Sequence, residues 1–217
     1  MNVLEGIRVI DLSTAYSAPI ATMQLADFGA DVIKIENTGK GDGARTWNPF
    51  VNGESLGYMY ANRNKRSITL NLKTEEGKKA LFELVKTADV VVENFRPGVT
   101  KKLGIDYEVM KQIKPDIIMA SLSGYGQTGP YAKKGAYSNL AEAQSGLMYL
   151  TGWPNGLPTG SGVAFGDSIA GMFLVQGIMY ALFHHERTGE GQYIDVAMVF
   201  PDRINSAWFC PGNSTWY

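Results

Sequence analysis

The chain has 217 residues, of which 45% are hydrophobic and 19% charged, the balance of an ordinary globular protein with one sizeable core. The net charge of -1 excludes a protein that holds nucleic acid by bulk positive charge. The single cysteine, Cys210, excludes an internal disulfide and fits a reducing compartment.

The first predicted elements form a strand–helix–strand unit. Residues 7–12 are rich in β-branched side chains and predict a strand. Pro19 suits the first turn of a helix over 20–28, and Gly29 suits its end. Residues 31–36 predict the next strand. Because strand, helix and strand follow one another so closely, we expect parallel pairing.

The middle of the chain continues the alternation after a polar, glycine-rich and aromatic stretch, 37–67, that predicts a long functional loop. The further predicted elements are an extended piece at 68–72, a helix from its cap Thr74 to 87, a strand at 89–95, a helix near 106–113, a strand at 115–122, a loop at 123–137, and a helix near 139–149. This order predicts an α/β fold: a Rossmann-like, mostly parallel sheet with helices on both faces.

The last predicted elements are a loop at 151–166, an apolar helix over 168–187 that stops at Gly189, and a strand at 193–199. The longest apolar run, 169–183, is shorter than the ~20 residues of a membrane span. The N-terminal stretch MNVLEGIRVIDLS does not show the pattern of a signal peptide. We therefore expect a soluble, cytoplasmic protein that binds neither nucleic acid nor membrane.

Several common sites are not predicted. The first turn after a strand, DLSTAYSAP, lacks the G-x-G-x-x-G of dinucleotide sites, so Glu36 is expected to be a solvated strand end or a loop anchor. Neither a P-loop motif nor a G-x-S-x-G elbow occurs. His184 and His185 are neighbours that project in different directions, so no metal site is predicted.

Two local features carry alternative interpretations. The cluster Arg63, Lys65 and Arg66, together with Lys73, would suit a ligand with several phosphates, or else forms a solvated basic face. Asp167 stands at the head of the apolar helix, where it would serve either as a helix cap or as a nucleophile.

Six stretches in a fixed order resemble the N-terminal half of the family III CoA-transferases, which include formyl-CoA and carnitine CoA-transferases. They are LEGIRVIDLSTAYSAPIATMQLADFGADVIKIE, NRNKRSITLNLKTEEGK, ADVVVENFRPG, ASLSGYGQTGPY, SGLMYLTG and GDSIAGM…ALFHHERTGEGQYIDVAM. The resemblance covers residues 4–199. It implies that 1–199 form the N-terminal part of a Rossmann-like, CoA-binding large domain. It also implies two interlocked chains of roughly twice this length, so we expect 200–217 to be an irregular tail and the chain to stop before the small domain.

The same resemblance implies the chemistry. Asp167, in FGDSIAGM, matches the aspartate that forms an acyl anhydride and then an aspartyl-CoA thioester while CoA moves from an acyl-CoA to a small carboxylic acid. Coenzyme A and acyl-CoA are then substrates, with no permanently bound cofactor. A homodimer or a complementing second chain is the expected assembly.

The resemblance also implies contacts with CoA, including one departure, since Asn37 stands where many members have arginine. The matching positions are Ala15, Tyr16, Ser17, Asn37, Leu70, Lys73, Asn94, Phe95, Arg96, Lys102, Lys134, Gly135, Ala136 and Tyr137.

Two alternatives stay open. A 2-methylacyl-CoA racemase of the same superfamily would use a histidine after the loop near position 135, where this chain reads GAYSNL. A truncated, non-catalytic CoA-binding remnant is the other.

Overall fold

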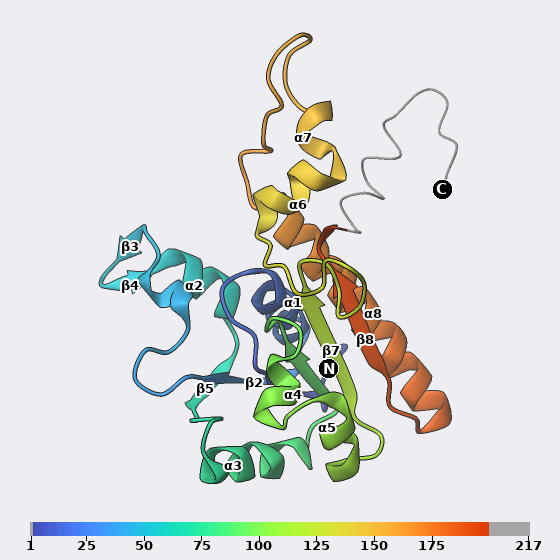
Figure 1. Ribbon diagram of the computed structural model, residues 1–217. Coiled ribbons are helices and arrows are strands. Elements are labelled where there is room, and N and C mark those ends of the chain that lie inside the picture. The colour runs from blue at the N-terminus through green and yellow to red at the C-terminus, as the bar shows by residue number, and fades with distance from the viewer. Residues whose placement is uncertain (1, 200–217) are drawn as a thin grey trace.

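The computed structural model describes residues 2–199, and its centre is a six-stranded sheet (Figure 1). Across the sheet the strands are β5 (Arg66–Thr69), β2 (Asp31–Glu36), β1 (Arg8–Asp11), β6 (Val90–Glu93), β7 (Ile118–Ser123) and β8 (Tyr193–Ala197). Every neighbouring pair is parallel, which confirms the predicted fold class. Counted along the chain the order is third, second, first, fourth, fifth, sixth, the order of Rossmann folds.

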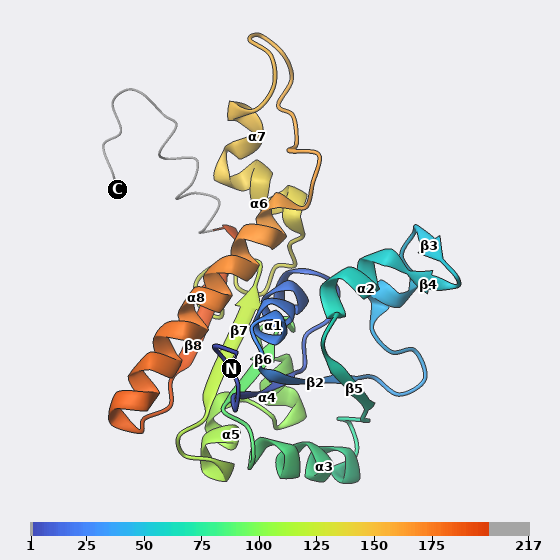
Figure 2. The same ribbon diagram turned by 180° about the vertical axis from the view of Figure 1, so that it is seen from behind.

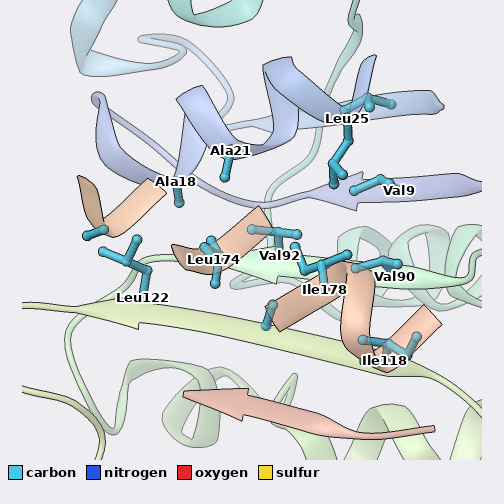
Figure 3. Packing of buried hydrophobic residues seen from close by; sticks show 14 of the residues in the cluster. Val9, Ala18, Ala21, Leu25, Val90, Val92, Ile118, Leu122, Leu174 and Ile178 are labelled. Carbon is cyan, nitrogen blue, oxygen red and sulfur yellow. The ribbon is translucent and has the colours of Figure 1, made fainter. Parts of the chain in front are cut away.

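Helices cover both faces because the strands are apolar on both sides. On β1, Val9 belongs to one core cluster and Ile10 to the other. The first cluster lies under α1 (Ser17–Asp27) and α8 (Phe165–Thr188), as Figure 3 shows. The second lies under α3 (Glu75–Val85) and α5 (Tyr107–Ile113). The predicted helices on both faces are confirmed.

Two helix starts follow directly from local sequence. The Thr74 hydroxyl accepts from the backbone N–H of Gly77 at 3.1 Å and caps α3 as predicted. Asp106 accepts from the N–H of Val109 at 3.3 Å and caps α5 in the same way.

The prediction of one long loop over 37–67 is wrong. The segment holds the 3-10 helix η1 (Gly43–Thr46), an antiparallel pair of β3 (Phe50–Val51) and β4 (Glu54–Ser55), the helix α2 (Leu56–Asn62) and the start of β5. These elements are too short to show a hydrophobic period, which is why a sequence pattern did not reveal them.

The predicted helix at 139–149 is broken in two. α6 (Ser138–Ser145) and α7 (Leu147–Leu150) are separated by Gly146, whose φ of 88° ends a helix. Figures 1 and 2 show that α6, α7 and the loop after them project from the body, and we call residues 138–164 the arm. The short helix α4 (Val99–Leu103), between Gly98 and Gly104, was not predicted.

The helix α8 is longer than the apolar run that marks it. Its 24 residues are long and apolar enough to cross a membrane, and it is the one such helix within residues 2–199. Ala170, Leu174 and Ile178 on it are nevertheless fully buried in the core cluster against the sheet. One face of α8 is thus packed against the sheet, while Met172, Tyr180 and Phe183 on the helix are exposed. The expected tail at 200–217 lies outside the described residues.

Candidate active site

The centre of the sheet is where the winding of the chain reverses. β1 and β6 are neighbours, yet α1, which follows β1, covers one face, and α5, which comes after β6, covers the other. In parallel sheets of this kind the ligand crevice opens beyond the carboxyl ends of two such strands. The turns after β1 and β6 therefore frame the candidate site.

One pair of residues locks these two turns together. The N–H of Thr14 donates to Oδ1 of Asn94 at 2.9 Å, and Nδ2 of Asn94 donates to the Thr14 carbonyl oxygen at 2.8 Å. Ala15, with a φ of 69° that is uncommon outside glycine, donates its N–H to Asp42 at 3.0 Å. Asn94, predicted to contact CoA, thus shapes the crevice through its side-chain amide.

A cavity of about 390 Å³ opens beside the hydrogen-bonded pair Thr14 and Asn94. The predicted site residues that line it are Ala15, Tyr16, Ser17, Asn94, Phe95, Arg96, Lys134, Gly135, Ala136, Tyr137 and Asp167. The loop after β6, which carries Arg96, meets the loop after β7, which carries Gly135, at this cavity. The approach is close: a Cβ added to Gly135 would lie 3.3 Å from Nη2 of Arg96. Residues that are distant in sequence thus form the wall of one central cavity.

A second cavity, of about 310 Å³, adjoins the central cavity at Thr14 and Phe95. It contains three more of the predicted residues, Asn37, Leu70 and Lys73. Lys102 is exposed on α4 and lines none of the three cavities described within residues 2–199.

A third cavity, of about 540 Å³, lies between the arm and the start of α8. It shares Tyr137 and Asp167 with the central cavity. Asp167 therefore stands where the central cavity and this arm-side cavity meet, whereas the second cavity is not lined by Asp167.

The interpretation of Asp167 as the cap of α8 is wrong. The N-cap position is Ala164, and Asp167 is the third helical residue. The cap comes from the arm, because the N–H of Gly166 donates to Oγ of Ser138 at 2.9 Å. The Ser17 hydroxyl on α1 lies close enough to the Asp167 carboxyl to lower its pKa.

The surroundings of Asp167 also change its affinity for a proton. Burial raises the pKa of the Asp167 carboxyl, the Ser17 hydroxyl lowers it, and the nearby Glu142 charge raises it further. The pKa of Asp167 is therefore above its ordinary value, and a more basic carboxylate is a better nucleophile.

The basic cluster predicted as a phosphate site forms ion pairs with aspartates of the same chain. Each of its three cations pairs with an aspartate: Arg63 with Asp27, Lys65 with Asp11, and Arg66 with Asp31. The Lys65 side chain is only 1% exposed. These ion pairs fasten α2 and β5 to the sheet and to α1, so this part of the polyphosphate prediction is wrong.

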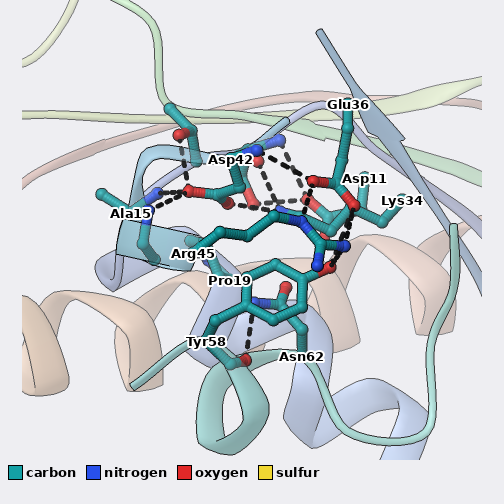
Figure 4. A network of polar contacts seen from close by, with 12 residues as sticks. Asp11, Ala15, Pro19, Lys34, Glu36, Asp42, Arg45, Tyr58 and Asn62 are labelled. Carbon is teal, nitrogen blue, oxygen red and sulfur yellow. Dashed lines mark hydrogen bonds and ion pairs between the residues drawn. The ribbon is translucent and has the colours of Figure 1, made fainter. Parts of the chain in front are cut away.

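Two buried ion pairs tie the 37–67 segment to β1 and β2 (Figure 4). Lys65 donates to Asp11 at 2.9 Å, and Nζ of Lys34 lies 2.8 Å from Asp42. Burial acts to raise the pKa of Asp11, but the charges of Lys65 and Lys34 outweigh it and lower this pKa to about 2.

Glu36 is a loop anchor, one of the two roles expected for it (Figure 4). Its carboxylate accepts from the N–H of Asp42 at 2.8 Å, from Arg45 at 2.8 Å, from the Tyr58 hydroxyl at 2.9 Å and from the Ser67 hydroxyl at 2.6 Å. The Arg45 guanidinium holds the pKa of Glu36 far below its usual range, against the effect of burial. With these donors in place Glu36 is not available to a ribose hydroxyl.

Sequence reasoning missed three residues that build the site. Ser138 caps α8, Glu142 accepts from Ser138, and Asp42 accepts from Thr14 and Ala15. No local sequence pattern could have identified them, because most of their hydrogen-bond partners are distant in sequence. Ser138 and Gly166, for example, are 28 residues apart.

Comparisons with known proteins identify the family. The family model of CoA-transferase family III matches residues 4–202. The chain is 48% identical over 196 residues to an acetyl-CoA:oxalate CoA-transferase of Acetobacter aceti, with 89% of this chain and 50% of that protein covered. It is 46% identical over 193 residues to a succinyl-CoA:glutarate CoA-transferase of Homo sapiens, with 88% and 44% covered.

A solved structure has the same fold. The crystal structure of a CAIB/BAIF family protein from Brucella suis superposes with a TM-score of 0.91 at 41% identity, covering 96% of this chain and 57% of that one. The chain spans about half the length of the curated relatives it matches. Since the family model covers nearly all of the described residues, the chain belongs to the family III CoA-transferases.

Proposed function

We propose that the protein moves CoA from an acyl-CoA donor to a carboxylic acid, with Asp167 as the covalent nucleophile. The observation that carries the proposal is the position of Asp167 between two cavities, with its carboxylate free of the capping role. The names of the relatives, an acetyl-CoA:oxalate and a succinyl-CoA:glutarate CoA-transferase, support the reaction type.

In this proposal CoA lies along two of the cavities. Its nucleotide end occupies the cavity beside Lys73, where Leu70 and Leu72 offer an apolar wall. The pantetheine arm passes Phe95, which lines both cavities, and brings the thioester to Asp167. Arg96 and Lys134 add positive charge along the central cavity, which suits an anionic ligand.

The first half of the reaction transfers CoA to the enzyme. A carboxylate oxygen of Asp167 attacks the thioester carbonyl carbon, the C–S bond breaks, and CoA leaves as the thiolate. The product is a mixed anhydride of the acyl group and Asp167. The thiolate then attacks the aspartyl carbonyl, which releases the donor acid as its carboxylate and leaves an aspartyl-CoA thioester.

The second half repeats these steps with the acceptor acid. The acceptor carboxylate attacks the aspartyl thioester and expels the CoA thiolate, which forms a second anhydride. The thiolate attacks the acceptor carbonyl, giving the new acyl-CoA and free Asp167. The cycle consumes no water and moves no electrons between redox states.

The test is Asp167→Asn in the full-length protein, with Asp106→Asn as the matched control. Both changes replace a carboxylate near a helix start by its amide, and an asparagine at the cap position of α5 should still cap that helix. Asp167→Asn should lower turnover by about three orders of magnitude or more with folding kept, because an amide cannot form the anhydride.

The covalent step has its own measurement. After incubation of the wild type with acyl-CoA and hydroxylamine, mass spectrometry should find an aspartyl hydroxamate at position 167. Near-normal transfer by Asp167→Asn would contradict the proposal, and exchange of the acyl α-proton with solvent deuterium without transfer would indicate a racemase.

We further propose that the active form is a homodimer. The arm exposes large apolar side chains, with Tyr149 82%, Trp153 88% and Leu157 87% exposed. Such a concentration of apolar surface is typical of an interface between chains.

A further inference from the structure

The start of α8 is capped by two residues of the arm that act in series. The N–H of Gly166 donates to Oγ of Ser138 at 2.9 Å, and the Ser138 hydroxyl donates to Oε1 of Glu142 at 3.0 Å. Ser138 and Glu142 are 6% and 3% exposed. A buried serine thus links the first turn of α8 to the negative charge of Glu142 by two hydrogen bonds. A negative charge near a helix N-terminus is stabilising.

Glu142 is held in place from its other side as well. Its Oε2 accepts from the N–H of Ser161 at 3.1 Å and from the Ser161 hydroxyl at 2.9 Å. Burial acts to raise the pKa of Glu142, but the Ser161 and Ser138 donors outweigh it, so this pKa lies below its ordinary value. Glu142 is therefore ionised, and its hydrogen bonds to Ser138 and Ser161 link the beginning of the arm to its end.

This cap occupies a position that Asp167 could otherwise fill. A carboxylate at the third residue of a helix commonly turns back to the free N–H groups of the first turn. Here the N–H of Gly166 already has its acceptor in Ser138, and Asp167 lines the same cavity as Ser17 of α1. Glu142 also lies close enough for its charge to raise the pKa of Asp167.

We propose that Glu142, acting through Ser138, is a positioning residue for Asp167: it caps α8 from outside and so keeps the nucleophile directed at the cavities. The inference rests on the proposed function of Asp167. It concerns the orientation and reactivity of the nucleophile and assigns no substrate contact to Glu142.

The test uses Ser138→Ala, Glu142→Ala and Glu142→Gln in the full-length protein. Glu76→Gln, on the exposed face of α3, is the control. Ser138→Ala and Glu142→Ala should lower kcat and the rate of hydroxamate formation at Asp167 by roughly 10- to 100-fold, since a small misplacement of a reacting group has effects of that size. KM for the acyl-CoA should change by no more than about twofold.

The conservative variant separates geometry from charge. Glu142→Gln keeps an oxygen for the Ser138 hydroxyl, and the Ser161 hydroxyl can turn to accept from the new amide NH2. The variant should therefore retain kcat within about fivefold at its best pH. Loss of the Glu142 charge should move the acidic limb of its kcat profile to lower pH, because the pKa of Asp167 falls. An acidic limb that does not move would show that Glu142 does not act on the Asp167 carboxyl and would count against the inference.

The outcomes are distinguishable. No hydroxamate at position 167 in the wild type would overturn the proposed function and this inference together. A wild-type hydroxamate with unchanged rates in Ser138→Ala and Glu142→Ala would overturn this inference alone. Losses that disappear when rates are divided by the folded fraction, measured by circular dichroism, would also overturn it.

Discussion

At the scale of single residues, the cations of this chain divide into two groups by their partners. Arg63, Lys65 and Arg66 are neutralised by aspartates of the fold. Lys73 and Arg96 line the cavities and form no ion pair within residues 2–199. A cation without an internal partner gains more by meeting a phosphate, so we expect the second group to bind the ligand.

Replacing Lys73 with alanine should therefore weaken CoA binding by about tenfold, the effect of losing one charge-assisted hydrogen bond. The matched change Arg66→Ala should leave CoA affinity unchanged, since it breaks an exposed ion pair to Asp31. Isothermal titration calorimetry with CoA at fixed salt measures both. Equal losses in the two variants would contradict this division.

The buried environment of Glu93 predicts that the stability of the fold depends on pH. It ends β6, is 2% exposed, and accepts from the N–H of Phe95 at 2.7 Å. Burial raises its pKa from the ordinary 4.5 to about 7, against the effects of Ser121 and the Phe95 N–H. Asp195 adds to the rise.

Glu93 should accordingly make the fold less stable as the pH rises. Its proton is held more tightly in the folded than in the unfolded chain, so its stabilising effect is complete below pH 4.5 and is lost as the pH rises to about 7. The difference in unfolding free energy between wild type and Glu93→Gln should fall by about 3 kcal/mol across this window. Urea unfolding from pH 4.5 to 8 measures it, and a constant difference would refute the assignment.

At the scale of elements, the contact between α1 and α8 positions Asp167, the proposed nucleophile. A Cβ added to Gly171 would lie 2.7 Å from the backbone oxygen of Ser17. Ser17 starts α1, and it lines the central cavity together with Asp167. The two helices can approach this closely only because position 171 carries no side chain, so the packing of the core and the geometry of the site depend on the same contact.

Gly171→Ala should thus destabilise the fold by about 1–3 kcal/mol and also lower turnover, because α1 and Ser17 must move away from α8. Gly57→Ala in α2 is the matched control, since its added Cβ would meet nothing closer than 3.6 Å. That change should be neutral or stabilising by up to about 1 kcal/mol. Thermal unfolding with an activity assay compares them, and an unaffected Gly171→Ala enzyme would count against the tight contact.

At the scale of the whole molecule, the sheet and the arm have different surroundings. The sheet is covered on both faces by its helices, whereas the arm projects from the body with apolar side chains exposed (Figures 1 and 2). The site uses both, because Asp167 lies where the arm-side cavity meets the central one. A partner that covers the arm would therefore lie beside a cavity that Asp167 also lines.

Because we propose a homodimer, we expect the full-length protein to sediment as a dimer at micromolar concentration. The double change of Trp153 and Leu157 to serine should shift it toward monomer, because it removes two of the most exposed apolar groups of the arm. Val3→Ser, at an exposed apolar residue outside the arm, should leave the dimer intact. A wild type that sediments as a monomer would contradict the proposal.

The sequence by itself determined the features that depend on neighbours along the chain. Strands β1, β2, β6 and β7 follow from short β-branched runs, and the cap of α3 from Thr74. The alternation of strands and helices determined the parallel α/β fold, because parallel strands need crossover helices. The resemblance also brought forward Asp167 and most of the residues that line the central cavity.

Only the tertiary structure decided which groups are free to act. The cluster Arg63–Arg66 reads as a phosphate site until its aspartate partners, distant in sequence, are seen. Asp167 reads as a helix cap until Ser138, 28 residues away from Gly166, is found in that role. The physical reason is the same in both cases: a charge or a hydrogen-bond donor is available to a ligand only if the fold has not already satisfied it, and the partners that satisfy it are brought close by packing rather than by sequence.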